Sequence, residues 1–485
     1  MTTRVDFINN RHPPLLITSG GLEQKMHRFI PVSTLRRGFS TSTSSEIPLL
    51  GPALLVTAVS AVAGGSYLFS DQIRRTSLYL KVSDSIVVPL LRFMDAEDAH
   101  NYTIMAAKYK LTPMEKPRPR NCQEITDNIY AKRRLKIEEA SQQQMNFVAP
   151  PSSTSRRLET KVWGKTFPNP IGMAAGFDKH AEIMGPLLDL GFGFVEVGGV
   201  TPFPQNGNSK PRSFRLTEDQ AIINRYGLNS HGAEAVCKRL YDFKALLQEN
   251  IQKKMQINAQ GCRRTQGIIG VNLAKNTETK QTAKEDYSLG VQALGPHVDF
   301  IVMNISCPNV GWTSKLKDSE ISELIVEVIE TRNTHCSQIP VLLKIGPDYD
   351  DEKIKSIVQV ATNTKVDGII VSNTSKARPD SLISSHRHEA GGLSGQPIKD
   401  RAMLTLQKVY ALTKGKIPLI GVGGIATGED VYQRIRAGAS LVEVYTAMTY
   451  GGASLVQDMK LELDQCLLRD GFQNVSEAVG ADYRK

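Results

Sequence analysis

Cysteine is scarce in this chain, and its spacing excludes several kinds of site. The 485 residues contain six cysteines, and no two of them form a CxxC pair. Iron–sulfur clusters and structural zinc require clustered thiols or a HExxH-like histidine spacing, which is also missing, so we expect no metal. Six scattered thiols further indicate a reducing compartment and no disulfide framework.

Aromatic residues are also few, at 6% of the chain, and no stripe of alternating basic and aromatic residues occurs. The net charge of +10 is therefore not read as a sign of nucleic-acid binding, while an anionic membrane or an anionic ligand remains open. The hydrophobic fraction of 40% and the charged fraction of 22% are typical of a globular protein. The length exceeds what one compact domain needs, so we expect appended segments.

The N-terminal region is typical of targeting and anchoring. Residues 1–46 are rich in arginine, poor in acidic residues and end in RRGFSTSTSS, which predicts a mitochondrial transit peptide, with a disordered basic tail as the alternative. Residues 47–70 carry no charged side chain and are long enough to cross a bilayer core as a helix. Because nothing globular precedes this run to cover it, we expect a membrane span rather than a buried core helix.

Two further segments precede the main domain. In residues 71–110 apolar runs alternate with charges, and we expect Pro89 to separate two short helices because it cannot continue the first one. Apolar side chains after the proline would suit a lipid-facing cap, the mouth of a channel for an apolar ligand, or a hairpin packed on the next domain. They are Leu90, Leu91, Phe93 and Met94. Residues 111–158 are polar and proline-rich and are expected to form a linker or insertion.

From residue 159 to 485, short apolar runs alternate with amphipathic helical stretches. The runs are rich in Ile, Val and Leu, as strands buried on both faces must be, and they span 170–176, 194–200, 267–273, 300–306, 340–346, 368–374, 418–424 and 441–447. Eight such units predict an α/β fold of the (β/α)₈ TIM-barrel type, with a doubly wound sheet as the alternative. The stretch 243–266 is expected to be a lengthened helix and loop.

Polar residues lie near the ends of the predicted strands, where a barrel builds its active site. Asn272, Asn304, Lys344 and Asn373 occupy the third to sixth runs. One such Asn is more often a turn residue than a ligand, but four polar groups on one rim indicate a bound polyfunctional ligand. The loops GVGGIATGED and YTAMTYGG follow the last two strands and are typical of a phosphate grip.

Several motifs make the chain recognisable. AAGFDKHAE, AIINRYGLNSHG, NISCPN, GGLSG and GVGGIATGED occur in strand order. Together they resemble the dihydroorotate dehydrogenase family across residues 159–485, and the N-terminal extension resembles its quinone-dependent branch. This resemblance implies one FMN, oxidation of (S)-dihydroorotate to orotate in pyrimidine synthesis, and ubiquinone as the acceptor. It also implies an inner-membrane protein whose barrel faces the intermembrane space, with no obligatory protein partner.

The resemblance implies roles for individual residues. The FMN set is Ala174, Ala175, Gly176, Gly199, Asn272, Asn304, Lys344, Ser372, Gly395, Gly424, Tyr445 and Thr446. The substrate set is Lys179, Asn224, Arg225, Tyr226, Gly227, Leu228, Asn304, Asn309, Asn373 and Thr374. His100 and Arg215 match residues of the quinone passage. Amide side chains suit the carbonyl and N–H groups of orotate, and a lysine suits the negative charge of a reduced flavin; a rim salt bridge is the alternative role for Lys179 and Lys344.

Two positions depart from the family pattern. In NISCPN the position of the catalytic base holds Cys307, whereas the quinone-linked branch usually has Ser there; Gly199 replaces a Ser found in some relatives. A thiol titrates near pH 8.5, so we hypothesise that Cys307 is the base, the alternative being a small buried apolar residue. Two other functions stay open, a fumarate-linked dihydroorotate oxidase of the soluble branch and a barrel that binds FMN without catalysis.

Overall fold

The computed structural model describes residues 74, 76–115, 157–256, 267–278, 281–306 and 316–484, which belong to one compact unit. The predicted transit peptide, the predicted membrane span and most of the predicted linker 111–158 lie outside these residues, and so does part of the stretch 243–266. Within the described ranges, no helix combines the length and the apolar character that crossing a bilayer requires.

Eight parallel strands close into a barrel in the order β10-β12-β13-β3-β4-β7-β8-β9. They are β3 (Ile171–Met173), β4 (Phe194–Val200), β7 (Ile268–Leu273), β8 (Phe300–Asn304), β9 (Val341–Ile345), β10 (Gly368–Val371), β12 (Leu419–Val422) and β13 (Ala439–Val444). Each lies within or close to one of the eight predicted runs. The predicted (β/α)₈ barrel is confirmed, and the doubly wound sheet is excluded because β10 pairs with both β9 and β12, which closes the sheet.

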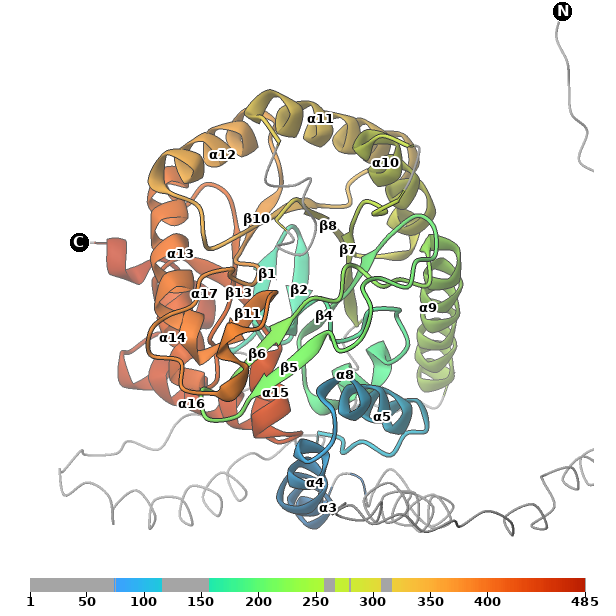
Figure 1. The fold of residues 1–485 in the computed structure, drawn as a ribbon, viewed down its shortest axis with the longest axis vertical. Coiled ribbons are helices and arrows are strands. Elements are labelled where there is room, and N and C mark those ends of the chain that lie inside the picture. Colours follow the sequence, from blue (N-terminus) through green and yellow to red (C-terminus); the bar gives the residue numbers. More distant parts are fainter. Residues whose placement is uncertain are drawn as a thin grey trace, which may run out of the picture. The chain divides into compact units, whose positions relative to one another are not determined.

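Helices follow the strands and form the outer layer of the barrel in Figure 1. They are α8 (Met184–Leu190), α9 (Ala233–Gln256), α10 (Ala283–Leu294), α11 (Asp318–His335), α12 (Asp351–Asn363), α13 (Lys399–Thr413), α14 (Gly428–Arg436), α15 (Thr446–Gly451), α16 (Leu455–Arg469) and α17 (Val475–Ala478). Local sequence sets several of their starts. Thr282 and Thr427 each form a capping box with an acidic residue three positions later, which satisfies N–H groups that a helix start leaves free.

The amino-terminal end of the barrel is closed by a hairpin of β1 (Thr160–Val162) and β2 (Lys165–Phe167). Phe167 packs edge to face on Phe194, and Phe194 packs in the same way on Phe300, with ring centroids 5.5 and 6.0 Å apart. Glycines make room for these rings: a Cβ added at Gly270 would lie 2.1 Å from the ring of Phe300. The bottom of the barrel is therefore a packed aromatic core, and a ligand site can form only at the opposite end.

We expect Gly270→Ala to destabilise the barrel by about 1–3 kcal/mol or more, because the added methyl group overpacks a dense core. Urea unfolding of the purified variant measures this change. Gly185→Ala in α8 is the matched control, since its Cβ would meet the nearest atom at an ordinary 3.5 Å. Equal stability of the two variants would contradict the packing argument.

A second sheet, which the sequence analysis did not foresee, covers part of the carboxyl end of the barrel. It joins β5 (Ser213–Leu216), β6 (Ala221–Asn224) and β11 (Gly392–Gly395) in antiparallel pairs. Its strands come from two insertions separated along the chain by four of the eight barrel strands, one insertion after β4 and one after β10. This sheet adds a wall beside the barrel opening.

The N-terminal helices correct one prediction. They are α3 (Ser77–Val82), the π-helical turn η2 (Ser83–Val87), α4 (Val88–Arg92) and α5 (Ala96–Lys108). The helix runs on across Pro89 instead of ending there, because Val88 donates its N–H to Ser83, five residues back, and the proline falls in the first turn of α4, where a missing N–H is tolerated. The separation lies at residues 93–95, where the carboxylate of Asp95 caps α5.

Polar contacts hold these helices on the barrel. Asp84 in η2 accepts hydrogen bonds from the backbone of Ala453 and Ser454 at 2.8 and 3.2 Å. Glu97 in α5 receives two hydrogen bonds from the guanidinium of Arg212, at 2.9 and 3.0 Å. These contacts show that the segment packs on the barrel, which is one of the alternatives that the sequence left open.

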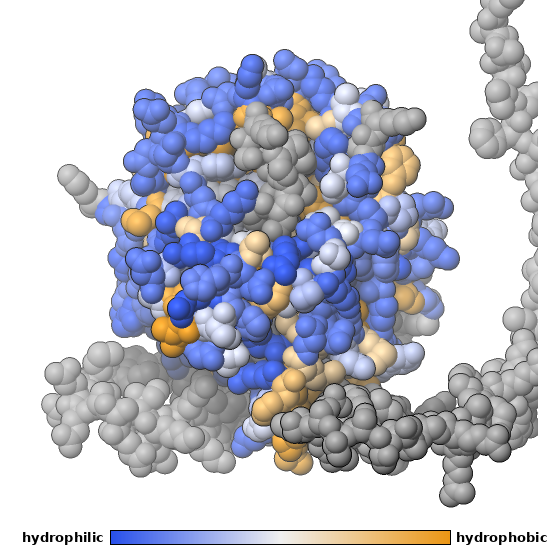
Figure 2. All heavy atoms as spheres, in the orientation of Figure 1, coloured by the Kyte–Doolittle hydropathy of each residue, from blue (hydrophilic) through white to orange (hydrophobic). Residues whose placement is uncertain are grey.

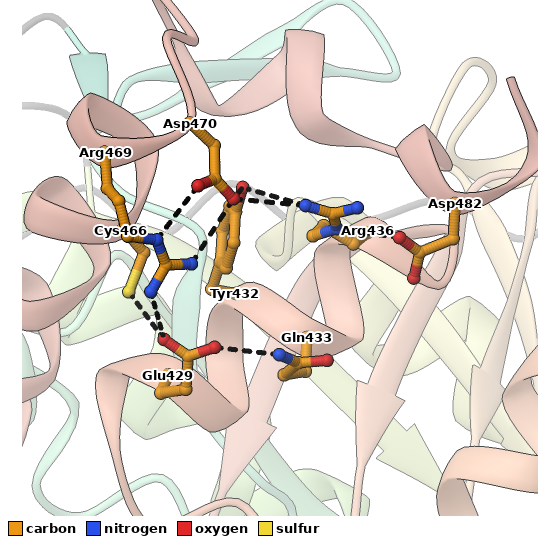
Figure 3. A network of polar contacts seen from close by, with 8 residues as sticks. All are labelled: Glu429, Tyr432, Gln433, Arg436, Cys466, Arg469, Asp470 and Asp482. Carbon is orange, nitrogen blue, oxygen red and sulfur yellow. Dashed lines mark hydrogen bonds and ion pairs between the residues drawn. The ribbon is translucent and has the colours of Figure 1, made fainter. Parts of the chain in front are cut away.

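The last helices are tied to the barrel by the network in Figure 3. Arg436 of α14 bonds Asp470 after α16 at 3.1 Å and Asp482 near the C-terminus at 2.7 Å. On the other side of Tyr432, Cys466 donates to Glu429 at 3.0 Å. Burial and this contact with a carboxylate raise the pKa of the thiol to about 12, so Cys466 is a structural and unreactive cysteine.

Candidate active site

A cavity of about 450 Å³ opens at the carboxyl ends of the barrel strands, within the size range of small-molecule sites. Most of the predicted binding residues line it, although they come from all eight strand ends and from the added sheet. Those lining it are Ala174, Ala175, Gly176, Lys179, Gly199, Asn224, Tyr226, Gly227, Leu228, Asn272, Asn304, Lys344, Ser372, Asn373, Thr374, Gly395, Gly424, Tyr445 and Thr446.

Three asparagines form one hydrogen-bonded row along the rim. Asn373 donates to Asn304 at 3.2 Å, and Asn304 donates to Asn272 at 3.1 Å. Parallel register places them side by side, since Asn272 pairs with Val302, two residues before Asn304. Because each amide already holds its neighbour in one orientation, the row presents preset donors and acceptors to a ligand.

Below this row lies a buried ionic cluster. Asn272 donates to Glu196 at 2.6 Å, and the ammonium of Lys344 lies 3.0 Å from Glu196 and 3.5 Å from Glu443. Both carboxyl groups have no exposed surface. Burial opposes the charge of Lys344, but the two carboxylates raise its pKa, so Lys344 is a cation at the floor of the cavity.

The other end of the cavity is lined by glycine and hydroxyl groups. Gly395 and Gly424 have φ values of 98° and 70°, and a Cβ at Gly424 would lie 2.5 Å from the Cα of Lys399. Thr446 begins α15 and donates its hydroxyl to Ser394 at 2.9 Å. Backbone without side chains and hydroxyl groups at this end are what a phosphate group requires.

Lys179 adds a second cation to the cavity lining, beside Tyr226. The ammonium of Lys179 sits 3.9 Å from the ring centre of Tyr226, and the guanidinium of Arg212 lies 5.3 Å from the same ring. Burial lowers the pKa of Lys179 to about 8. The negative charge of Glu97 raises this pKa, and the positive charge of Arg212 lowers it. A lysine held this close to neutrality is suited to bind an anion, because the anion restores its preference for the charged form.

Binding of an anionic substrate should therefore weaken as the pH rises through about 8, because Lys179 loses its proton there. We expect kcat/KM to fall on that alkaline limb, and Lys179→Arg to move the limb to higher pH because arginine stays charged. Lys179→Met should lower kcat/KM throughout. Steady-state rates measured across the pH range test this, and an unmoved alkaline limb in Lys179→Arg would contradict it.

The two predicted quinone-passage residues lie behind this cavity and do not line it. His100 on α5 packs edge to face on Phe177, with ring centroids 5.2 Å apart, and parallel to Tyr445 at 6.5 Å. Burial and the nearby charge of Lys179 lower its pKa to about 3, so it is neutral. Arg215 donates to the carbonyl groups of Arg92 and Met94 at 2.9 and 3.2 Å, which links β5 to the end of α4.

Of the predicted cofactor and substrate residues that the structure describes, Arg225 is the one that does not line the cavity. Arg225 lies on the far side of β6, where it bonds Glu389 at 2.6 Å and stacks on Phe214 at 4.4 Å. Cys307 and Asn309 lie outside the described residues. The described residue closest to them in sequence, Ser306, donates to the carbonyl of Lys344 and receives a hydrogen bond from Asn373, so this loop starts at the cavity.

The sequence analysis missed Glu196 and Glu443. Both stand in the middle of apolar strands, in FVEVGGV and LVEVYTA, where an acidic residue is out of place unless it is paired. That pattern is a signal that could have found them. Five further lining residues were not predicted: Ser213 and Ser394 from the added sheet, Gln220 and Gln396 next to it, and Tyr450 from α15. Nothing in the local sequence marks these polar residues as part of a site.

Comparison with known proteins agrees with this geometry. Residues 157–467 match the family model described as dihydroorotate dehydrogenase. The dihydroorotate dehydrogenase (quinone), mitochondrial, of Oryza sativa subsp. japonica is 41% identical over 87% of this chain and 85% of its own length. That of Mus musculus is 39% identical over 88% and 97%. The crystal structure of DHODH from Eimeria tenella in complex with ferulenol superposes with a TM-score of 0.66 at 35% identity, over 81% of this chain and 96% of that one.

Proposed function

Because the chain belongs to the dihydroorotate dehydrogenase family, we infer that it oxidises dihydroorotate to orotate and passes the electrons to a quinone, a step of pyrimidine synthesis. The observation that carries this inference is the cavity itself. It combines a row of amides, a buried lysine beneath them and a second lysine, Lys179, at one barrel opening. This donor set matches a flat ring that bears carbonyl, N–H and carboxylate groups.

We propose FMN as the cofactor. The described residues fit it in three respects: Asn272 and Lys344 offer polar contacts to a ring edge, the small residues from Ala174 to Gly176 allow a flat group to approach the backbone, and the end near Gly424 suits a phosphate. FMN supplies a hydride acceptor when it is bound. Lys344 would stabilise the negative charge that such an acceptor gains.

In the proposed reaction the substrate loses a proton from one carbon and a hydride from the adjacent carbon, which leaves the double bond of orotate. Cys307 takes the proton as a general base. Asn304 and Asn373 hold the substrate ring, while Lys179 binds its carboxylate. Ser306 orients the amide of Asn373 at 3.2 Å and so positions the substrate relative to the loop that carries the base.

We propose further that residues 71–110 admit the quinone from a membrane, with residues 1–46 as a mitochondrial transit peptide, 47–70 as the anchor in the inner membrane and the barrel facing the intermembrane space. Support comes from exposed apolar side chains on the N-terminal helices. The exposed fractions of Leu78 and Phe93 are 70% and 89%. Figure 2 shows hydrophobic surface gathered at its lower edge, where α3 and α4 lie in Figure 1. Such a patch is typical of a surface that contacts lipid.

The double substitution Leu78→Asp with Phe93→Asp should raise KM for a long-chain ubiquinone by about tenfold or more, because one buried apolar side chain contributes at least about 1.5 kcal/mol. Reduction of a water-soluble dye by dihydroorotate should stay unchanged. The control is Leu404→Asp on α13, a leucine that is 56% exposed on the barrel surface. A similar loss in both variants would argue against the proposed membrane-facing surface.

The proposed function is tested on the detergent-solubilised full chain. Anaerobic dihydroorotate should bleach the visible absorbance of the bound flavin, and added ubiquinone should restore it. Turnover with fumarate in place of quinone would identify the soluble type of acceptor instead. A folded, colourless protein that cannot take up FMN would rule out the proposed chemistry.

A further inference from the structure

The cluster of Glu196, Lys344 and Glu443 holds more acidic groups than basic ones. Both carboxyl groups are fully buried, and Lys344 is 5% exposed. Glu443 is on β13, and two ionisable groups act on it. They are Glu196 on β4 and Lys344 on β9. If both acids were ionised, one lysine would leave a buried net negative charge, which is unfavourable in a low-dielectric interior.

The contacts show which of the two carboxyl groups is paired with Lys344 and which is not. Glu196 accepts hydrogen bonds from Asn272 at 2.6 Å and from Lys344 at 3.0 Å. Neither oxygen of Glu443 accepts a hydrogen bond with normal geometry, although the ammonium of Lys344 lies 3.5 Å away. Glu443 therefore stands beside the same ammonium group as Glu196 but receives no hydrogen bond from it. A fully buried carboxyl group whose charge is not compensated by a cation of its own is expected to carry a proton.

Electrostatics agrees with this assignment. Burial would raise the pKa of Glu196, but the charge of Lys344 and hydrogen bonds from its neighbours hold it below its usual value. Burial and the negative charge of Glu196 raise the pKa of Glu443 well above its usual value. The protons of such a pair belong to the pair as a whole, yet the hydrogen bonds from Asn272 and Lys344 favour Glu196 as the ionised member.

We propose that Glu443 is a neutral acid beside the ion pair of Glu196 and Lys344, so that the floor of the cavity carries no net charge and a bound cofactor can gain negative charge on reduction without repulsion from below. Glu443 lines the cavity. It is a positioning residue, because it acts through the charge of the cluster and not on the reacting atoms. The inference rests on the proposed FMN site for its consequence, but the protonation of Glu443 itself can be observed without any cofactor chemistry.

Infrared spectroscopy of the full-length holoprotein, labelled with ¹³C-glutamate, detects the proton directly. At neutral pH we expect one carboxylic-acid C=O band that shifts with the glutamate label and moves in D₂O. The label matters because burial also raises the pKa of Asp178, to about 6. Glu443→Gln should remove the band. So should Glu196→Gln, because Glu443 then becomes the ionised partner of Lys344. No labelled acid band in the unmodified protein would overturn the proposal.

The reduction potential of the bound flavin provides the second measurement. Glu443→Gln replaces one neutral group by another, so the ratio of affinities for reduced and oxidised cofactor should change by less than tenfold, about 30 mV for a two-electron couple. An ionised Glu443 would predict a larger rise, since its removal would favour the reduced anion. Glu196→Gln also keeps the cluster neutral, so the flavin potential should change by a similarly small amount in this variant. Loss of flavin from the unmodified protein would instead refute the proposed cofactor and leave the infrared result intact.

Discussion

In the Cys307→Ala variant, dihydroorotate should reduce the bound flavin about 10²–10⁴ times more slowly than in the unmodified protein. This factor is the usual contribution of a positioned general base. The variant should still bind FMN and still form the complex with substrate, because Asn272, Asn373 and Lys179 belong to other strand ends than β8, the strand that precedes Cys307. Anaerobic stopped-flow spectroscopy separates the two steps, since binding perturbs the flavin spectrum and reduction bleaches it.

Cys307→Ser is the matched variant for this experiment. An alcohol has a far higher pKa than a thiol, so the serine variant should retain part of the rate and shift the pH profile for flavin reduction to higher pH. Unchanged reduction in Cys307→Ala would remove Cys307 from the mechanism. The loop containing this residue lies outside the described part of the chain, so the experiment also tests whether it reaches the cavity.

Lys344→Met should lower the free energy of unfolding by about 3–5 kcal/mol, because it leaves Glu196 buried without its cation. In this variant burial raises the pKa of Glu196, because the cation that lowers it in the unmodified protein is gone. A carboxyl group whose folded pKa lies above its unfolded value stabilises the protein at low pH and loses that contribution as the pH rises. We therefore expect the destabilisation to be larger at about pH 8 than at about pH 5.

Urea unfolding at both pH values measures this effect, and flavin content and reduction rate are read on the same samples. Lys353→Met is the matched control, because Lys353 pairs with Asp318 at 2.7 Å on the surface. A surface ion pair contributes at most about 1 kcal/mol. Equal losses in the two lysine variants would contradict the cluster described here.

The barrel could be predicted because each strand carries its own signal. A strand covered on both faces must be largely apolar, and residues 268–273 and 341–345 show this in their amino-acid composition, with Asn272 and Lys344 as the polar exceptions that enter the site. The glycine-rich ends could be predicted for a related reason: positions such as Gly424 require a positive φ and have no room for a Cβ. Both constraints act within a few residues and are visible in the sequence.

Pro89 shows where local reasoning failed. Proline predicts a helix end, yet the π-helical turn that precedes it shifts the hydrogen bonding by one residue and lets the helix continue. The choice of that turn depends on contacts made elsewhere, such as the bond from Ala453 to Asp84. The sheet of β5, β6 and β11 escaped prediction because the pairing of β6 with β11 joins two separate insertions.

The amino-acid sequence alone specifies the barrel, the rim of amides and the glycine-rich end, because buried strands and tight turns restrict the residue type at each position. The tertiary structure decides which of these groups come into contact. Glu196, Lys344 and Glu443 are separated by about a hundred residues or more along the chain, and their charge balance depends on distances of a few ångströms across the barrel. Electrostatic energy in a buried site varies steeply with such distances, and no local pattern encodes them.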